Sequence, residues 1–406
     1  MSSFSENRQS RYQEIAPLRI CVFIFAIFPF LGVKGIDTML GETVRQAWQI
    51  AGAGVLFAEL EIQDVVEWDD YILYFAIEQI YLLLVTALKS QFLMGLLITA
   101  LANILIALLI RRDRINFLYA VSISMVIVAA ANALSMLRTG TGGFDKVYFI
   151  GGKNALSIML IPGVFVLYLL QEEAHEKTGS ARFLKWLFYG YSVVALGSVI
   201  YGKSGTGIVM SLIAFAVIIT VDRKFVSKRL MIIGLGVVYG VILMGDSVFS
   251  SRLWIDFTTA IAKTPTMTYR TNVWASAERL FMNNPLWGAG KVFTLSFVDD
   301  FGIRRGVSEA HNFLLQILCS SGLAGLFLNY KILRNSIGRL DVNDRRHKIV
   351  FVCYALILVN GFTEAVNYKF FSILIPALAN SYLADIPHQR IVPIQTSGMM
   401  KRDEMR

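Results

Sequence analysis

The sequence VSEAHNFLLQILCSSGLAGLF, residues 307–327, is the clearest sign of the architecture. From Phe313 onward it is apolar enough to lie in lipid, yet Glu309, His311 and Asn312 come directly before that part. A helix needs about 20 predominantly apolar residues to cross a bilayer. The stretch therefore predicts a transmembrane helix that begins with a histidine–asparagine pair at the edge of the membrane.

The composition extends this interpretation to the rest of the chain. Its 406 residues are 55% hydrophobic and only 17% charged, with a mean hydropathy of +0.58, whereas about 25% of a typical soluble domain is charged. The three cysteines, Cys21, Cys319 and Cys353, are dispersed in apolar runs, which argues against a disulfide framework or a zinc site. We expect an all-α polytopic membrane protein of about 12 transmembrane helices, with one large non-cytoplasmic loop containing short helices.

Residues 1–406 are expected to form a single integral membrane domain. The predicted spans are 17–33, 43–60, 71–88, 91–110, 117–136, 154–170, 183–200, 206–221, 229–249, 311–330, 348–365 and 367–384. The second of these contains Arg45, Gln46 and Gln49, which are unusual inside a membrane.

Lysine and arginine are distributed unevenly between two sets of loops. Most of the 38 lie in the N-terminal segment, in residues 111–114, 171–185, 221–229 and 331–348, and in the C-terminal tail. Positively charged loops stay in the cytoplasm, so both termini are predicted to be cytoplasmic. This topology also accounts for the net charge of +9, and no nucleic-acid partner is predicted.

Residues 250–310 are the large periplasmic or extracellular loop of this topology. The sequence YRTNVWASAERLFMNN (269–284) places its apolar residues at helical spacing. The following PLWGAG (285–290) predicts a stop and then a turn. The loop is therefore expected to be structured.

The arginines of this loop allow two interpretations. Arg270, Arg304 and Arg305 could contact lipid headgroups, or they could bind an anionic substrate. A guanidinium suits phosphate because its planar fork donates two parallel hydrogen bonds and it stays charged. Three such groups near one histidine would suit a diphosphate.

His311 also allows two interpretations. A histidine at the start of a helix can be a cap or an interfacial residue. It can also accept a proton at neutral pH, because an unperturbed imidazole titrates near pH 6.5. The other three histidines lie in predicted cytoplasmic loops, and Asn312 and Glu309 could orient the ring of His311.

Several ionisable groups lie within or beside the predicted spans. Such groups are functional candidates because burying them in lipid is costly, although Glu78 could equally pair with a neighbouring helix. They are Glu78, Lys153 with Asn154, Lys203 with Ser204, and Glu364. The sequence YGKSGTG around Lys203 lacks the spacing of a phosphate-binding loop, and no motif for a bound metal or cofactor occurs.

Taken in order, these motifs resemble the O-antigen ligase and polysaccharide polymerase family, integral membrane enzymes that act on undecaprenyl-diphosphate-linked glycans. The similarity is closest over residues 269–327 and weaker from 150 to 385. The matching residues are Arg270, Trp274, Pro285, Gly288, Gly290, Phe293, His311, Asn312, Leu315, Gly322, Leu323 and Gly325. GGKNALSIML (151–160) also looks like the start of a mid-chain span in that family.

The resemblance implies a metal-independent glycosyltransferase without a cofactor, with its active site in residues 250–310. It implies His311 and Arg270 as catalytic residues. The implied substrate-binding residues are Arg304, Arg305, Asn312, Glu309, Trp274, Lys203, Ser204, Lys153, Asn154 and Glu364. The implied partners are an undecaprenyl-diphosphate-linked oligosaccharide, membrane lipids, and a chain-length regulator or flippase, in the bacterial inner (plasma) membrane.

One departure from the family bears on the reaction. Ligases of the family usually carry a second arginine where a mid-chain span begins, and here Gly205 takes that place beside Lys203. This difference favours a polymerase of O-antigen, capsule or exopolysaccharide over a ligase that transfers the glycan to lipid A core of lipopolysaccharide. A transporter or flippase of lipid-linked sugars, and a non-catalytic assembly protein, stay open as alternatives.

Overall fold

The computed structural model describes most of the chain. The described residues are 14–61, 68–89, 94–141, 146–178, 181–221, 227–243, 251–252, 255–256, 269–299 and 301–384. Parts of the predicted spans 91–110 and 229–249, much of the first half of 250–310, and most of both terminal segments lie outside these residues.

Helices dominate the described part. They are α2 (Pro17–Ile27), α3 (Lys34–Ala58), α5 (Asp70–Leu88), α6 (Met94–Arg112), α7 (Arg114–Thr139), α8 (Lys153–Thr178), α9 (Arg182–Tyr201), α10 (Gly205–Ile219), α11 (Lys228–Leu243), α14 (Arg270–Asn283), α15 (Phe313–Asn335), α16 (Arg345–Gly361) and α17 (Phe370–Ala384). Short 3-10 helices η1 (Phe28–Phe30) and η2 (Ile337–Arg339) follow α2 and α15, and strands β1 (Leu295–Val298) and β2 (Arg304–Val307) form one hairpin.

Six helices of the described part are long and apolar enough to cross a membrane, namely α5, α6, α7, α8, α9 and α15. A seventh span is possible if α2 and α3, which meet at a bend of 88°, count as one. The polytopic helical architecture is thus supported, but the prediction of twelve spans is not confirmed. Helices α10 and α17 have 15 residues each and are about 22 Å long at 1.5 Å per residue, which is shorter than a bilayer core.

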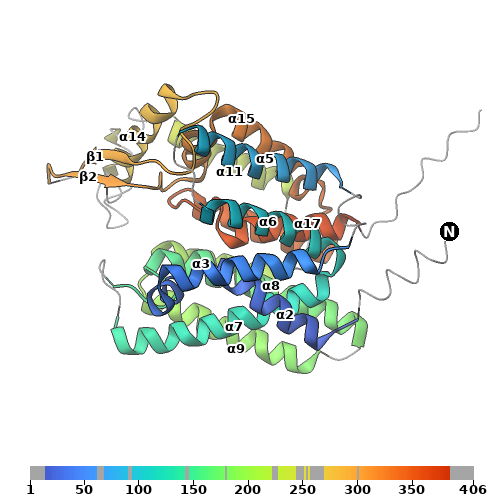
Figure 1. Cartoon of the computed structure of the whole chain (residues 1–406). Helices are drawn as coiled ribbons and strands as arrows, with labels where there is room; N and C mark the ends of the chain where they lie inside the picture. Colours follow the sequence, from blue (N-terminus) through green and yellow to red (C-terminus); the bar gives the residue numbers. More distant parts are fainter. Residues whose placement is uncertain are drawn as a thin grey trace, which may run out of the picture.

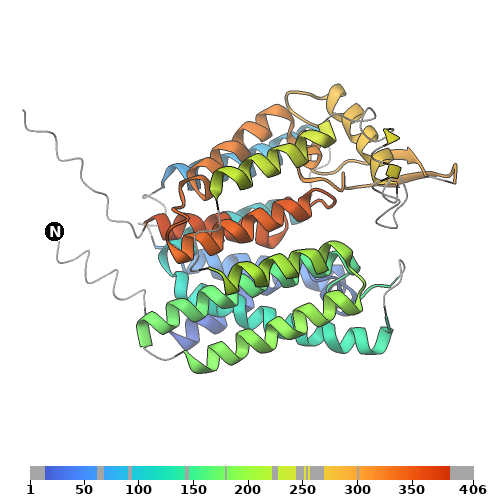
Figure 2. The same ribbon diagram turned by 180° about the vertical axis from the view of Figure 1, so that it is seen from behind.

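The loops gather at two ends of the helix bundle. Helix α14 and the hairpin project from one end in both views (Figures 1 and 2). Ion pairs join helix ends at the other end of the bundle: Arg114 of α7 with Glu173 of α8 at 2.7 Å, and Arg346 of α16 with Glu176 of α8 at 2.5 Å. These cations belong to the loops predicted to be cytoplasmic, so the hairpin end corresponds to the predicted outer face.

The hairpin is an element that the sequence analysis did not predict. Its strands pair antiparallel, with Leu295 opposite Val307 and Val298 opposite Arg304. Leu295 and Phe297 are buried in a small core that also holds Trp274 of α14. Each strand has only four residues, and the side chains of β2 are largely exposed, so no clear alternation marks them in the sequence.

Candidate active site

The PLWGAG turn (285–290) docks into a break in α15. Gly322 interrupts that helix with φ 61° and ψ −160°, a backbone conformation that is essentially restricted to glycine. The turn and the helix are then joined backbone to backbone: Ala289 N donates to Cys319 O at 2.7 Å, Gly290 N to Ser320 O at 3.0 Å, Leu323 N to Pro285 O at 2.9 Å and Ala324 N to Leu286 O at 3.1 Å. These bonds satisfy groups that a broken helix would otherwise leave unpaired.

Two of the motif glycines allow this close approach. A Cβ atom on Gly288 would lie 2.4 Å from the backbone nitrogen of Ser321, and one on Gly322 would lie 2.5 Å from the carbonyl oxygen of Leu286. No side chain fits at either position without moving backbone. The Pro-x-x-Gly-x-Gly and Gly-Leu-x-Gly motifs therefore pack against each other, backbone to backbone.

Helix α14, which confirms the helix predicted over 269–284, supports the histidine. Its Trp274 is completely buried, and its indole Nε1 donates to the carbonyl oxygen of His311 at 3.4 Å. The same indole packs edge to face on Phe362, with ring centroids 5.9 Å apart. Trp274 is thus placed to hold the His311 backbone from inside the small core.

Asn312 fixes the start of α15. Its side-chain oxygen accepts from the N–H of Leu315 at 3.0 Å, as an N-cap residue does. Its amide nitrogen donates to the carbonyl oxygen of Phe362 at 3.0 Å. His311 just before it has a positive φ of 48°, which is uncommon for a non-glycine residue, so two neighbouring contacts hold the histidine in a sparsely populated conformation.

The carboxylate of Glu364 contacts both predicted catalytic residues, Arg270 and His311. Its Oε1 accepts hydrogen bonds from the Arg270 guanidinium and from Asn154 Nδ2, the latter at 2.7 Å. Its other oxygen, Oε2, lies 3.5 Å from Nδ1 of His311. Four separate segments therefore meet at one carboxylate: the start of α8, the start of α14, the residue before the α15 cap and the loop after α16.

The arrangement defines how His311 can exchange a proton. The imidazole is one-third exposed, the Glu364 side chain is only 10% exposed, and Nδ1 of the imidazole is buried. Nδ1 faces the carboxylate, so Nε2 is the ring nitrogen left to face another molecule. A carboxylate beside an imidazole also stabilises the imidazolium that forms.

Among the residues that the structure describes, the guanidinium of Arg270 has two hydrogen-bond partners. Nε donates to the carbonyl oxygen of Thr363 at 2.8 Å, and one terminal nitrogen donates to Glu364. A guanidinium has five N–H donors in a fixed fork, so further donors remain for a phosphate oxygen.

The other predicted site residues are spread over several elements. Lys153 begins α8 beside Asn154, whereas Ser204 is buried at the N-cap of α10 and Lys203 before it is exposed. Arg304 and Arg305 lie on β2, where Arg305 pairs with Asp299 at 2.6 Å.

The central position of Glu364 was not evident from the sequence, which gave it only as one of several substrate-binding candidates. A signal was present, since Glu364 is the sole acidic residue between 357 and 384. The sequence analysis also did not name two lysines, Lys291 and Lys369, as site residues; they line a cavity together with Glu309 and Ala365. Within the described ranges, no three His, Cys, Asp or Glu side chains gather as a metal site, and metal independence stays a prediction.

The fold and site define a polytopic helical membrane protein with a carboxylate, an imidazole and a guanidinium joined at one end of the bundle. A family model described as O-Antigen ligase matches residues 190–330, from α9 into α15. The match confirms the resemblance drawn from the motifs and supports membership of the O-antigen ligase and polymerase family. It includes Arg270, Trp274 and His311, whereas Asn154 and Glu364 lie outside it. No curated protein sequence matches the chain significantly.

The family match and the composition together support three general statements. The chain is an integral membrane protein with several apolar helices. The match supports a function of the O-antigen ligase or polymerase type, and members of the matching family are glycosyltransferase-like enzymes. The family further implies a lipid-linked glycan as substrate.

Proposed function

We propose that this protein is a polymerase that joins undecaprenyl-diphosphate-linked oligosaccharide repeats into O-antigen, capsular or exopolysaccharide chains. The reaction takes place at the outer face of the bacterial inner membrane. The observation that carries the proposal is the contact of Glu364 with Arg270, His311 and Asn154. An acid–base pair beside a guanidinium suits transfer of a glycan from a diphosphate to a hydroxyl group.

In the proposed reaction, a hydroxyl oxygen of the acceptor sugar attacks the anomeric carbon of the donor glycan. The bond between that carbon and the phosphate oxygen breaks, and the lipid diphosphate leaves with the bonding electron pair. Nε2 of His311 accepts the hydroxyl proton, and Glu364 stabilises the resulting imidazolium. Arg270 donates its free N–H groups to the leaving diphosphate, which stabilises the charge that develops there.

A polymerase and a ligase differ only in the acceptor. The polymerase proposal rests on the exposed Lys203 and on Gly205, where family ligases usually have an arginine. An ammonium offers a point charge and no bidentate fork. The description of the matching family model favours the ligase as the second candidate.

Glu364→Gln is expected to lower the rate of glycan transfer about 10- to 100-fold. Glutamine keeps an acceptor for Asn154 and Arg270 but removes the negative charge that faces His311. A hydrogen bond to a charged group contributes about 1.5–3 kcal/mol, which corresponds to this range of rates. Initial rates on a lipid-linked oligosaccharide in proteoliposomes measure the effect, with Glu176→Gln, whose ion pair lies at the opposite end, as the control. Equal rates for the two variants would remove Glu364 from the mechanism.

Deletion of the gene in the native host, with plasmid complementation, tests the function itself. Gels of surface polysaccharide and extracts of lipid-linked sugars are compared with and without the protein. Single repeats on the lipid carrier, accessible from outside, are the expected result for a polymerase. Long chains accumulating on the carrier would indicate a ligase, repeats retained on the inner leaflet would indicate a flippase, and an unchanged ladder would exclude all three.

A further inference from the structure

A large polar cavity lies beside the proposed catalytic group. Its volume is about 670 Å³, and its lining includes Lys291, Glu309, Gln316, Ala365 and Lys369. Ala365 follows Glu364 in the chain, and Glu309 comes two residues before His311. Residues that are neighbours in sequence of Glu364 and His311 therefore line this cavity.

Lys369 has a counter-ion that a ligand can replace. Its Nζ lies 2.9 Å from a carboxylate oxygen of Glu309, and the two side chains are 44% and 41% exposed. Exposed ion pairs of this kind are weak because water screens both charges. A phosphate entering the cavity can therefore take the place of the Glu309 carboxylate on Lys369.

Lys291 brings a second ammonium to the same cavity. Its backbone N–H donates to the hydroxyl of Thr86 at 2.9 Å, and its Nζ lies 5.2 Å from the centre of the Tyr368 ring. Burial lowers the pKa of Lys291 to about 8; Glu78 opposes this shift and Lys369 adds to it. An ammonium that is poorly hydrated and close to another cation gains from a bound anion.

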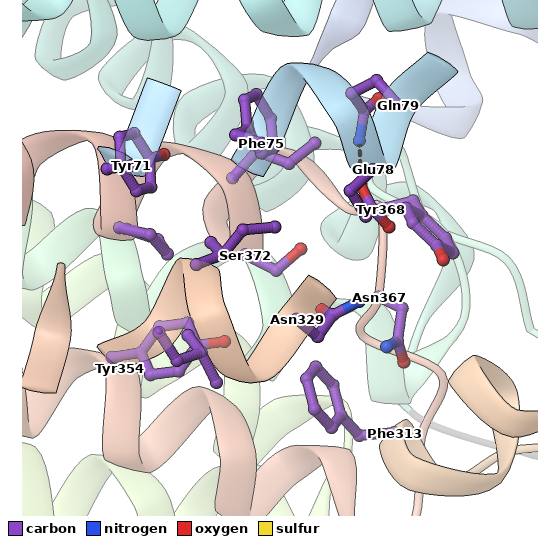
Figure 3. Close-up of a pocket in the computed structure, with 14 residues that line it drawn as sticks. Tyr71, Phe75, Glu78, Gln79, Phe313, Asn329, Tyr354, Asn367, Tyr368 and Ser372 are labelled. Atoms are coloured by element: carbon purple, nitrogen blue, oxygen red, sulfur yellow. Dashed lines mark hydrogen bonds between the residues drawn. The ribbon is translucent and has the colours of Figure 1, made fainter. Parts of the chain in front are cut away.

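The carboxylate of Glu78 offsets part of the positive charge of Lys291. Figure 3 shows Glu78 and Gln79 on α5, with Tyr368 beside Glu78. The cavity between α5, α15 and the 367–372 segment holds only about 40 Å³, which is room for a few water molecules. Glu78 is therefore a neighbour of Lys291 rather than a group on the substrate's path.

A second cavity, of about 180 Å³ and lined mainly by apolar residues, adjoins residues 368–371. Its lining includes Phe30, Leu31, Ile158 and Phe371, and it shares Tyr368 and Lys369 with the polar cavity. Lys369 lines both cavities, so a molecule with an apolar chain attached to a charged head would find both environments next to it. A free phosphate would use only one of them.

We infer that Lys291 and Lys369 bind the diphosphate of the lipid-linked glycan in the polar cavity, while the first part of its prenyl chain enters the apolar cavity. This inference rests on the proposed function and assigns two further substrate-binding residues to it. Arg270 alone supplies too little positive charge for a diphosphate, which carries more than one negative charge. Its own charge is already paired with that of Glu364.

Binding of farnesyl diphosphate to the purified full-length protein in nanodiscs tests the inference. We expect Lys369→Gln and Lys291→Gln to weaken binding about tenfold or more each, because each removes a charge-assisted hydrogen bond. Glu309→Gln should bind more tightly than the wild type, since Lys369 loses its competing partner. The matched control is Lys146→Gln, an exposed lysine bonded to the carbonyl oxygen of Thr139, and it should bind as the wild type does.

Three further arms identify the source of the anion. Inorganic diphosphate should bind more weakly than the prenyl form, farnesol should bind weakly, and phosphatidylglycerol in the nanodisc should not displace the probe. Displacement by that lipid would overturn the inference in favour of a phospholipid headgroup site. Normal binding by both lysine variants would also overturn it, and it would leave the proposed function intact if the deletion strain still lacks polymer.

Discussion

His311→Ala is expected to lower the rate of glycan transfer by about 10²- to 10⁴-fold, the range that general acid–base catalysis contributes. Alanine removes the imidazole that accepts the hydroxyl proton in the proposed mechanism. The fold should be kept, because Asn312 caps α15 independently and the contact from Trp274 reaches the backbone carbonyl of residue 311.

Initial rates in proteoliposomes, with amounts of protein matched by immunoblot, measure this effect. The control is His175→Ala, since His175 is exposed on α8 at the opposite end of the bundle. A His311→Ala rate equal to that of the control would show that the histidine merely starts a helix. A large loss in both variants would point to damage of the fold and not to catalysis.

Gly322→Ala is expected to destabilise the protein by about 3 kcal/mol or more. The backbone conformation at residue 322 alone costs about 1–3 kcal/mol for a non-glycine residue. The new Cβ would also lie 2.5 Å from the carbonyl oxygen of Leu286 and 2.7 Å from the nitrogen of Gly288. Both contacts are with backbone, so the turn must leave the break and its hydrogen bonds to α15 are lost.

Thermal unfolding in detergent, followed by circular dichroism, measures the loss. Gly54→Ala is the matched control, because its Cβ would meet nothing within 4 Å in helix α3, and alanine is favoured over glycine in a helix. We expect the control to unfold at or above the wild-type temperature and Gly322→Ala well below it. Equal unfolding midpoints for all three proteins would contradict the close packing of the PLWGAG turn against α15 at Gly322.

Local patterns predicted the parts of the site that lie close together in sequence. The apolar spacing of 269–284 indicated α14, and the change from polar to apolar residues after Asn312 located the start of α15. The reason is that a helix is set by contacts three and four residues apart, which appear directly in the sequence.

Features that depend on distant segments could not be predicted in this way. Glu364 and Asn154 are 210 residues apart, and nothing in either neighbourhood specifies the other. The glycines at 288 and 322 were each noted, but the close approach of their backbones was not predicted. The twelve predicted spans are also not confirmed: among the described helices, α10 and α17 are apolar but short, and the predicted span 229–249 lies partly outside the described residues.

The docking of the turn into α15 limits how the outer part of this protein can be exchanged between relatives. A chimaera that receives only residues 269–299 would bring a turn shaped for another helix, and the host's residues 319–324 would no longer match it. Tyr81 of α5 also holds the turn against α15, because its hydroxyl contacts the carbonyl oxygens of both Trp287 and Ser321 at 3.0 Å. Substrate preference should therefore transfer between relatives only when the turn, the broken helix and this tyrosine are moved together.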